Sequence, residues 1–519
     1  MLPRLPYNIP GKSNQIVSFL GINYTDNYQD GHLENSMNLS THRYPYISTR
    51  RGRRLVDTGV TALSAWGDHK IHVKSGKLYY DDKEICAFPY EGKMQFAKIN
   101  SKLVVNVPGT GFYVIDTEAK TITDPKVEFT RASGVTVNDG DITFTSSISV
   151  PFAEQDAVKV TSSGKDFGYQ KITKIESNKI TFTNDCFKGK TGSVTNLSIK
   201  REVPDLDYIF VAANRVWGVS NEAQTIYSSH LGDPTNWFDY SGTADDSYAL
   251  AVASPGNFTA ACNLGSSLLF WKEGVLHKIL GSYPAEYQMY QYNINGVREG
   301  CYKSVINASE TLVYMSRKGL YTYNGGTASF LSQALGEHSF ENASAGFDGE
   351  NYFFSGLDNG ETGMYKYSFR NGIWLREDAT DAKDFAYISG ALYFLDNDGN
   401  VWLEDSGEED TDLEWECYFK PFYETSTGSY NRTGRAYEFK RYTKLVIRLE
   451  TTKLSKVFVH MKTDNGVWKL IKTFVGKEDG VKEVVVPIGR CDRAEVKLTG
   501  KGTCVIKQVM KEFILGGRK

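Results

Sequence analysis

The residue types that most often carry out catalysis are present, but their spacing matches no catalytic motif. The eight histidines are scattered, and His69 and His72 have no third ligand nearby, so we expect no metal site. Gly189 to Thr191 matches the end of a phosphate-binding loop, but Asn184 stands where that loop requires its first glycine. No HExxH, GxSxG or strand-linked GxGxxG sequence occurs. We therefore expect no catalytic residue, no bound metal and no cofactor.

Carboxylates are numerous, yet none of their groupings follows a ligand pattern. The densest group is Glu404, Asp405, Glu408, Glu409, Asp410 and Asp412. Its spacing differs from that of calcium loops, and we interpret it as a solvated loop. A glycan-cleaving enzyme would need two carboxylates that flank a cleft, which a sequence cannot show. Exposed aromatic rings could also form a glycan-binding face, so a carbohydrate-directed protein stays open as an alternative.

Basic residues are unevenly distributed along the chain. Residues 420–519 contain 22 Lys and Arg against 10 Asp and Glu, a net of +12, whereas residues 1–419 have 37 against 52, a net of −15. This division predicts separate domains with separate partners, and head-to-tail docking of subunits explains it as well as nucleic-acid contact does. Four arginines, Arg50, Arg51, Arg53 and Arg54, are clustered near the start. They could meet DNA phosphate or an acidic neighbour, or belong to a solvated turn.

The composition favours an all-β fold made in a reducing compartment. Aromatic residues make up 13% of the chain and glycines number 48, a mixture typical of half-buried strands joined by tight turns. The seven cysteines are far apart and form no CxxC pair, so we expect reduced thiols. The first residues resemble no signal peptide, and no apolar stretch is long enough to span a membrane. We expect synthesis in the cytoplasm.

A repeated hairpin is the strongest internal signal. The segments LVYMSRKGLYTY, YFFSGLDNGETGMYKYS and LYFLDNDGNVWL each read as strand, glycine turn and strand, and their first residues, Leu312, Tyr352 and Leu392, are 40 positions apart. Looser copies begin near Ile71, Leu103, Arg215 and Leu268. A period near 40 residues with short strands is typical of β-propeller blades, about seven here. A pair of β-sandwiches lacks such a period and is the weaker interpretation.

The remaining segments predict further domains around this propeller, which we assign to residues 59–126 and 204–417. Residues 127–203 lengthen the spacing between two hairpins and alternate cleanly, so we expect an inserted small β-domain. Residues 418–519 contain about six strand patterns, enough for a β-sandwich-like domain. Residues 1–58 are polar with weak periodicity, and we expect an extended N-terminal arm that lies on a neighbouring subunit.

Three regions together resemble a known family, the tail and head–tail nozzle (stabilisation) proteins of tailed bacteriophages. They are the segment that ends in PYISTRRGRR (residues 21–54), the segment NRVWGVSNEAQTIYSSHLGDPTNW (residues 214–237) and the C-terminal residues 490–517. The most specific part is Gly232, Asp233, Pro234 and Trp237. We expect these four residues to form a fixed turn, in which Asp233 caps the backbone and Pro234 fixes φ.

This resemblance implies a structural virion protein and not an enzyme. The family pattern is a propeller with an appended β-domain, arranged as a ring, commonly a hexamer, around the DNA exit channel. The implied partners are other copies of the chain, neighbouring portal, adaptor or tail proteins, and double-stranded DNA that passes without sequence-specific contact. The implied location is the phage tail of the virion. The insertion at 127–203 departs from the simplest pattern.

Two other functions are compatible with the residues. One is a carbohydrate-binding or glycan-cleaving propeller at a cell surface, which would need an aromatic shelf or a carboxylate pair in a pocket. The other is a host-side propeller that recruits a single protein partner as a monomer. A fold alone does not decide among these functions, so the choice depends on the site.

Overall fold

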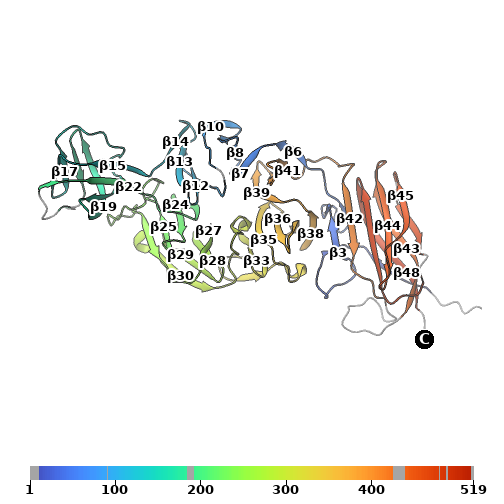
Figure 1. Ribbon diagram of the computed structural model, residues 1–519. Helices are drawn as coiled ribbons and strands as arrows, with labels where there is room; N and C mark the ends of the chain where they lie inside the picture. Colours follow the sequence, from blue (N-terminus) through green and yellow to red (C-terminus); the bar gives the residue numbers. More distant parts are fainter. Residues whose placement is uncertain are drawn as a thin grey trace, which may run out of the picture. The chain divides into compact units, whose positions relative to one another are not determined.

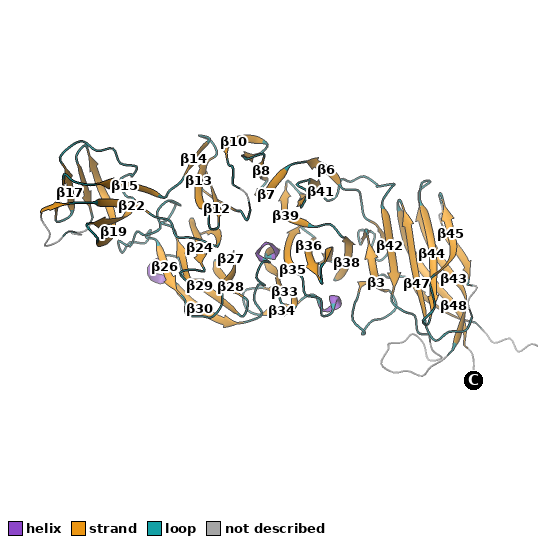
Figure 2. Cartoon of the chain, viewed as in Figure 1, coloured by secondary structure: helices purple, strands orange, loops and turns teal. Residues whose placement is uncertain are grey.

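The computed structural model describes residues 11–90, 92–183, 187, 192–424, 439–477, 480–486 and 489–515. Strands dominate this part of the chain, and its helices are three short 3-10 turns, η1 (Pro284–Glu286), η2 (Tyr302–Ser304) and η3 (Gln333–Leu335) (Figure 2). The chain divides into two compact units. Unit 1 comprises residues 1–58, 318–321 and 329–519, and unit 2 comprises residues 59–317 and 322–328.

Seven antiparallel sheets of four strands each form a β-propeller, and we call them blades 1 to 7 (Figure 1). Blades 1 to 4 belong wholly to unit 2. Blade 1 is β7 (Val60–Trp66), β8 (His69–Lys74), β9 (Lys77–Tyr80) and β10 (Lys83–Ala87). Blade 2 is β11 (Gln95–Ile99), β12 (Lys102–Val107), β13 (Gly111–Asp116) and β14 (Thr121–Thr123). Blade 3 is β23 (Tyr208–Ala212), β24 (Arg215–Ser220), β25 (Thr225–Ser228) and β26 (Tyr248–Ala251). Blade 4 is β27 (Phe258–Leu264), β28 (Ser267–Lys272), β29 (Val275–Leu280) and β30 (Gln288–Asn293).

The other three blades follow the same strand order. Blade 5 contains the boundary between the units and is β31 (Ile306–Ala308), β32 (Thr311–Ser316), β33 (Gly319–Tyr323) and β34 (Ala328–Phe330). Blade 6, in unit 1, is β35 (Glu341–Phe347), β36 (Asn351–Asp358), β37 (Glu361–Ser368) and β38 (Ile373–Asp378). Blade 7, also in unit 1, is β39 (Ala382–Ile388), β40 (Ala391–Asp396), β41 (Val401–Leu403) and β6 (Arg54–Asp57). The fourth strand of blade 7 therefore comes from the N-terminal segment, so strands from distant parts of the chain close this blade.

Apolar side chains between neighbouring blades explain why the sheets stack. Leu78 of blade 1 and Leu103 of blade 2 belong to one buried cluster, and Trp217 of blade 3 and Phe270 of blade 4 belong to another. The first strands of neighbouring blades pack side by side within each unit, as β11 does with β23 and β35 with β39. A single four-stranded sheet would leave both apolar faces in water, and stacking removes them.

The inserted β-domain has its own core in unit 2. Its eight strands form one sheet of order β15-β22-β18-β19-β20-β17-β16-β21. They are β15 (Val127–Arg131), β16 (Val135–Asn138), β17 (Asp141–Phe144), β18 (Ala157–Ser162), β19 (Lys165–Glu176), β20 (Lys179–Phe182), β21 (Gly192–Val194) and β22 (Leu197–Arg201). Val158, Ile172 and Ile199 are fully buried in this core. The alternation that predicted the domain thus places one face of each strand inward.

Two six-stranded sheets form the C-terminal β-sandwich of unit 1 (Figure 1). The first sheet contains β1 (Lys12–Ile16), β4 (Leu39–Ser40), β5 (Ile47–Thr49), β43 (Lys440–Thr451), β46 (Gly480–Val485) and β48 (Cys504–Leu515). The second contains β2 (Gly21–Ile22), β3 (His32–Met37), β42 (Glu414–Phe419), β44 (Lys456–Thr463), β45 (Lys469–Val475) and β47 (Ala494–Lys501). The sandwich thus includes β42, which begins four residues before the expected boundary at 418.

The expectation that the N-terminal arm lies on a neighbour is wrong for the described residues. β1 pairs with β48 from Lys12↔Phe513 to Ile16↔Val509, and β3 pairs with β42. The arm therefore supplies five strands to the chain's own sandwich and one to blade 7. Gly21 fits this path because its φ is +73° and an added Cβ would lie 2.3 Å from the carbonyl oxygen of Trp374. Pairing with these strands gives hydrogen-bond partners to the backbone N–H and C=O groups of the arm, which would be costly to bury without partners.

Candidate functional site

A buried cluster of charged groups joins the N-terminal arm to blades 6 and 7 within unit 1. Arg53 is 9% exposed, and its Nε donates a hydrogen bond to Glu404 Oε2 at 2.7 Å. Its Nη1 donates to Asp378 Oδ2 at 2.6 Å and to Thr380 Oγ1 at 3.0 Å. The guanidinium also lies over the ring of Phe394, 5.0 Å from its centroid. Arginine suits this position because its planar fork can hold two carboxylates at once.

Arg50 and the buried carboxylate of Glu377 complete the cluster. Arg50 Nε lies 3.2 Å from Glu377 Oε2 and donates a hydrogen bond to Asn38 Oδ1 at 2.8 Å. Complete burial raises the pKa of Glu377 to about 7, although Lys366, Arg50 and Arg53 act in the opposite direction. Burial alone would also raise the pKa of Asp378, but Arg53 and Thr380 hold it below its usual value. The pKa of Glu377 is therefore raised while that of the neighbouring Asp378 is lowered, so the two carboxyl groups ionise over different pH ranges.

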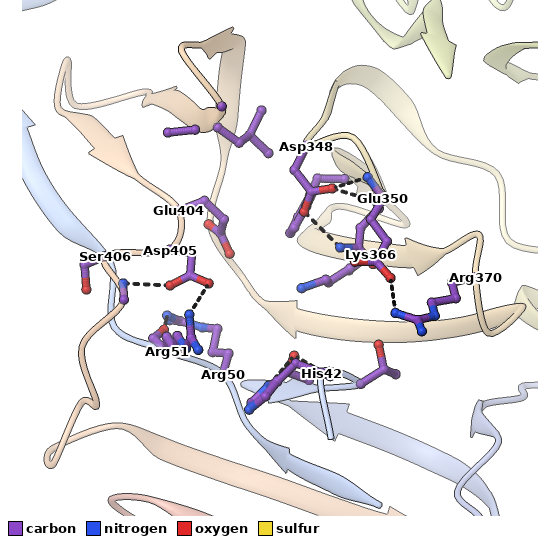
Figure 3. A pocket seen from close by; sticks show the side chains of 18 of the residues that line it. His42, Arg50, Arg51, Asp348, Glu350, Lys366, Arg370, Glu404, Asp405 and Ser406 are labelled. Atoms are coloured by element: carbon purple, nitrogen blue, oxygen red, sulfur yellow. Dashed lines mark hydrogen bonds and ion pairs between the residues drawn. The ribbon is translucent and has the colours of Figure 1, made fainter. Parts of the chain in front are cut away.

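A cavity of about 760 Å³ opens beside this cluster (Figure 3). The arm contributes His42, Tyr44, Arg50 and Arg51 to its wall, blade 6 contributes residues such as Lys366 and Arg370, and blade 7 leads into Glu404 and Asp405. Figure 3 shows Arg51 beside Asp405 and Arg370 beside Glu350, at 3.5 Å and 3.6 Å. Burial, together with Arg51, Lys366 and Arg43, lowers the pKa of His42. The wall therefore offers donors and acceptors together with apolar side chains such as Phe353 and Leu392.

The four clustered arginines occupy two different environments. Arg50 and Arg53 hold the carboxylates of the buried charged cluster, and only about a tenth of each side chain is exposed. Arg51 is about half exposed and pairs with Asp405, and Arg54 is exposed at the start of β6. The expected interface or DNA contact stays a prediction, and of the four arginines Arg51 and Arg54 are the ones with exposed side chains that could make it. This difference is not visible in the sequence, because only burial and pairing partners distinguish the four arginines.

The turn expected at Gly232 to Trp237 is present in unit 2. Asp233 Oδ1 accepts hydrogen bonds from the backbone nitrogen and the hydroxyl of Thr235, at 2.9 and 2.7 Å. Gly232 has φ +75°, a conformation that favours glycine. Trp237 is 1% exposed and donates from Nε1 to the carbonyl oxygen of Pro234 at 2.9 Å. Asp233 therefore caps the turn and Trp237 anchors it in the core between blades 2 and 3.

The same turn holds the inserted domain, a role that the sequence did not indicate. Asn236 Oδ1 accepts a hydrogen bond of 2.9 Å from the backbone nitrogen of Ala157 in β18. Lys171 of β19 pairs with the buried Asp239 at 2.8 Å, and Tyr169 stacks on Phe238 with centroids 4.2 Å apart. Polar and aromatic contacts thus attach the insertion to the connection that follows β25.

Other expectations about charged residues have mixed outcomes. Glu404 does not belong to a solvated loop: it is buried against Arg53, whereas its neighbour Asp405 is exposed. His69 Nδ1 donates a hydrogen bond of 2.6 Å to Asp81 Oδ2, and His72 stacks on Tyr79. The segment from Gly189 to Thr191 lies outside the described residues. No helix in the described ranges is both long and apolar enough to cross a membrane.

Exposed aliphatic side chains gather on the last two edge strands of the sandwich. β45 ends one sheet and β46 ends the other, and the two strands are in contact. The exposed aliphatic side chains on these strands and in nearby loops are Leu454, Val467, Leu470, Val475, Val481 and Val485. Val467 is 75% exposed and Val485 is 73% exposed. We call this group the apolar edge. Concentrated exposed apolar residues on unpaired strands are typical of association surfaces.

Comparisons with known proteins show similarity in fold only. No family model matches the chain, and no curated protein matches it. Among solved structures, BamB from Moraxella catarrhalis is 11% identical over 69% of this chain and 97% of its own, with a TM-score of 0.33. An exo-β-1,3-galactanase from Phanerochaete chrysosporium with galactose is 10% identical over 59% of this chain and 95% of its own, with a TM-score of 0.23. YCF48 bound to D1 peptide is 8% identical over 68% of this chain and 95% of its own, with a TM-score of 0.30. At these TM-scores the matches carry no argument about ligand, activity or partner.

Proposed function

We propose that this chain is a non-enzymatic structural subunit of a tailed-phage virion. In this proposal several copies, six in the family that the sequence resembles, form a ring in the tail or head–tail nozzle around the DNA exit channel. The neighbours would be portal, adaptor or tail proteins, and DNA would pass through the ring without sequence-specific contact. The proposal rests on the resemblance of three sequence regions together with one structural feature, the apolar edge.

The apolar edge supports self-association because it combines two features of a subunit interface. Among the described residues both of its strands end a sheet, and both expose aliphatic side chains to solvent between charged ones. Removing such surface from water contributes about 25 cal/mol per Å² of apolar area. A heterologous contact, in which this surface meets a different surface of the next copy, closes into a ring when the rotation between copies is suitable.

Charge offers a reason for the orientation of such a contact. The apolar edge is interspersed with Lys469, Lys472 and Lys482, and residues 420–519 carry a net charge of +12. Residues 1–419 carry a net charge of −15, so a neighbouring copy presents the opposite sign. Lysines on edge strands also discourage indiscriminate strand pairing, which favours one specific partner.

The experiment is to measure mass and particle images of the purified protein, alone and with phage particles from the source. A ring, or density for this chain in a virion tail, is the expected result. The double substitution V475K/V485K should abolish the ring or the incorporation into particles, and I122K on edge strand β14 is the matched control with an equally placed aliphatic residue. A chain that stays monomeric and is absent from every particle would overturn the proposal, as would normal assembly of V475K/V485K.

A further inference from the structure

The cavity beside the charged cluster has the size and the wall of a ligand site. Its volume of about 760 Å³ lies within the ~300–1,000 Å³ typical of small-molecule pockets. Three separate segments of unit 1 build it, namely the arm, blade 6 and the end of blade 7. The virion role proposed above does not use it.

The charges in the wall are balanced in number, and most of them pair with one another or with the buried charged cluster. Arg51 pairs with Asp405 at 3.5 Å, and Arg370 pairs with Glu350 at 3.6 Å. Arg50 is held by the buried Glu377 at 3.2 Å. An anionic or cationic ligand would have to compete with one of these pairs. A neutral polar ligand can instead accept or donate at the oxygen and nitrogen positions that the pairs leave open.

Two such positions belong to Lys366 and Glu404. The ammonium of Lys366 lies 4.8 Å from the centroid of the Phe353 ring and pairs with Glu377 Oε1 at 3.9 Å, a separation beyond hydrogen-bond distance, so within the described residues its N–H donors stay open. Glu404 uses Oε2 to hold Arg53, and within the described residues its Oε1 accepts no hydrogen bond. A donor and an acceptor therefore border the same cavity (Figure 3).

An exposed aromatic ring also borders the cavity. Tyr44 is 44% exposed, and its hydroxyl lies 3.4 Å from Ser18 Oγ, outside the cavity wall. The ring of a tyrosine can cover the C–H face of a flat ligand while its hydroxyl stays hydrated. Each hydroxyl of a sugar is at once a donor and an acceptor, so it can use both Lys366 and Glu404.

We infer that this cavity binds a neutral saccharide. The sugar hydroxyls contact the ammonium of Lys366 and the free oxygen of Glu404, and Tyr44 covers an apolar face of the sugar ring. The inference is independent of ring formation: it gives the subunit a glycan contact and holds or fails whatever the oligomeric state.

The test uses the full chain and a defined panel of sugars. D-glucose, D-galactose, D-mannose, L-rhamnose and N-acetyl-D-glucosamine represent neutral saccharides, with D-glucose 6-phosphate and N-acetylneuraminic acid as anionic comparators. Binding is measured by saturation-transfer NMR and by titration calorimetry. At least one neutral sugar should bind, and Y44A should weaken it about tenfold.

Matched variants keep the result interpretable. Y290A removes a ring of similar exposure, 42%, from β30 in unit 2 and should leave binding unchanged. K366M should weaken binding as well, and Y44A serves as the readout if K366M alters folding. Three results would overturn the inference: no neutral sugar binds, the anionic sugars bind instead with Y44A unaffected, or Y290A abolishes binding while Y44A does not. Recognition of a protein segment in place of a sugar would appear as the first of these results.

Discussion

Replacing Arg53 with alanine should destabilise the junction between the arm and blades 6 and 7 by roughly 3–5 kcal/mol. Arg53 donates charge-assisted hydrogen bonds to Glu404 and to Asp378, each worth about 1.5–3 kcal/mol. Its removal also leaves the fully buried Glu377 with less positive charge nearby. R53K should recover only part of the loss, because an ammonium lacks the fork that reaches both carboxylates.

Hydrogen exchange with mass spectrometry measures this effect locally. A loss of 3–5 kcal/mol corresponds to exchange that is roughly 10²- to 4 × 10³-fold faster in β6, β38 and β41. R51A is the matched control: Arg51 and Asp405 are both exposed, so their pair contributes about 0–1 kcal/mol. Equal effects of R53A and R51A would refute the argument that burial makes the difference.

The pH dependence of the R53A effect provides a second check. Arg53 helps to hold the pKa of Asp378 below its value in the unfolded chain, so that carboxylate stabilises the fold above the unfolded pKa and loses this contribution as the pH falls. The difference between R53A and the unaltered protein should therefore persist down to about pH 4 and shrink as the pH falls below it. A difference that grows on acidification would contradict the assignment of Arg53 as the partner of ionised acids.

Three further substitutions test other parts of the structure. G21A should destabilise the sandwich by roughly 2 kcal/mol or more, because the added Cβ is strained at a φ of +73° and clashes with Trp374. G59A has the same φ of +73° but no atom near the added Cβ, so it should cost less stability. Thermal unfolding compares the two variants, and equal losses of stability would show that the clash is absent. N236A should weaken the attachment of the inserted domain by about 1–3 kcal/mol, because it removes the acceptor of the Ala157 backbone N–H. Hydrogen exchange at the Ala157 amide should become faster while exchange in blade 4 stays unchanged. Unchanged exchange at Ala157 would rule out this attachment. The unaltered protein should lose stability as the pH rises from about 4.5 to about 7, because the raised pKa of Glu377 makes its ionisation unfavourable in the fold. E377Q should remove this loss of stability. Urea titrations at both pH values measure it, and an unchanged pH dependence in E377Q would refute the assignment.

The propeller was predictable because its signal is local. The segments that begin at Leu312 and Leu392 each contain a strand, a glycine turn and a second strand, and they correspond to β32–β33 and β40–β41. Strands that pair across a short turn show their alternation and their turn within about twelve residues of sequence. The insertion was equally visible, since β16 to β20 alternate and bury one face.

The path of the N-terminal arm could not be predicted, because its partners are distant in sequence. β2 and β4 have two residues each, too few to show a period, and β3 reads HLENSM with no clear alternation. Their register is set by strands that lie hundreds of residues later. The sequence predicted an extended arm on a neighbouring subunit, whereas the described part of the arm pairs with sheets of its own chain.

The cavity was hidden from the sequence for a related reason. Tyr44, Lys366 and Glu404 come from three segments, and none belongs to a motif. Glu404 is one of six clustered acids, and only its position opposite Arg53 separates it from its solvated neighbours. A charged side chain is identified as part of a site by its burial and its partner, both of which are properties of the fold.

The arm also determines when the fold can be completed. Strands β1 to β5 are the first described strands to be synthesised, yet their partners β42 and β48 are among the last. Such long-range pairing carries a loop-closure cost before any contact compensates it, which slows folding. Blade 7 also depends on residues that are distant in sequence, because β6 pairs with β41 and Arg53 contacts the carboxylates of the buried charged cluster. Both ends of unit 1 therefore become ordered together, and a subunit would present its apolar edge on a finished sandwich only after the whole chain has been made.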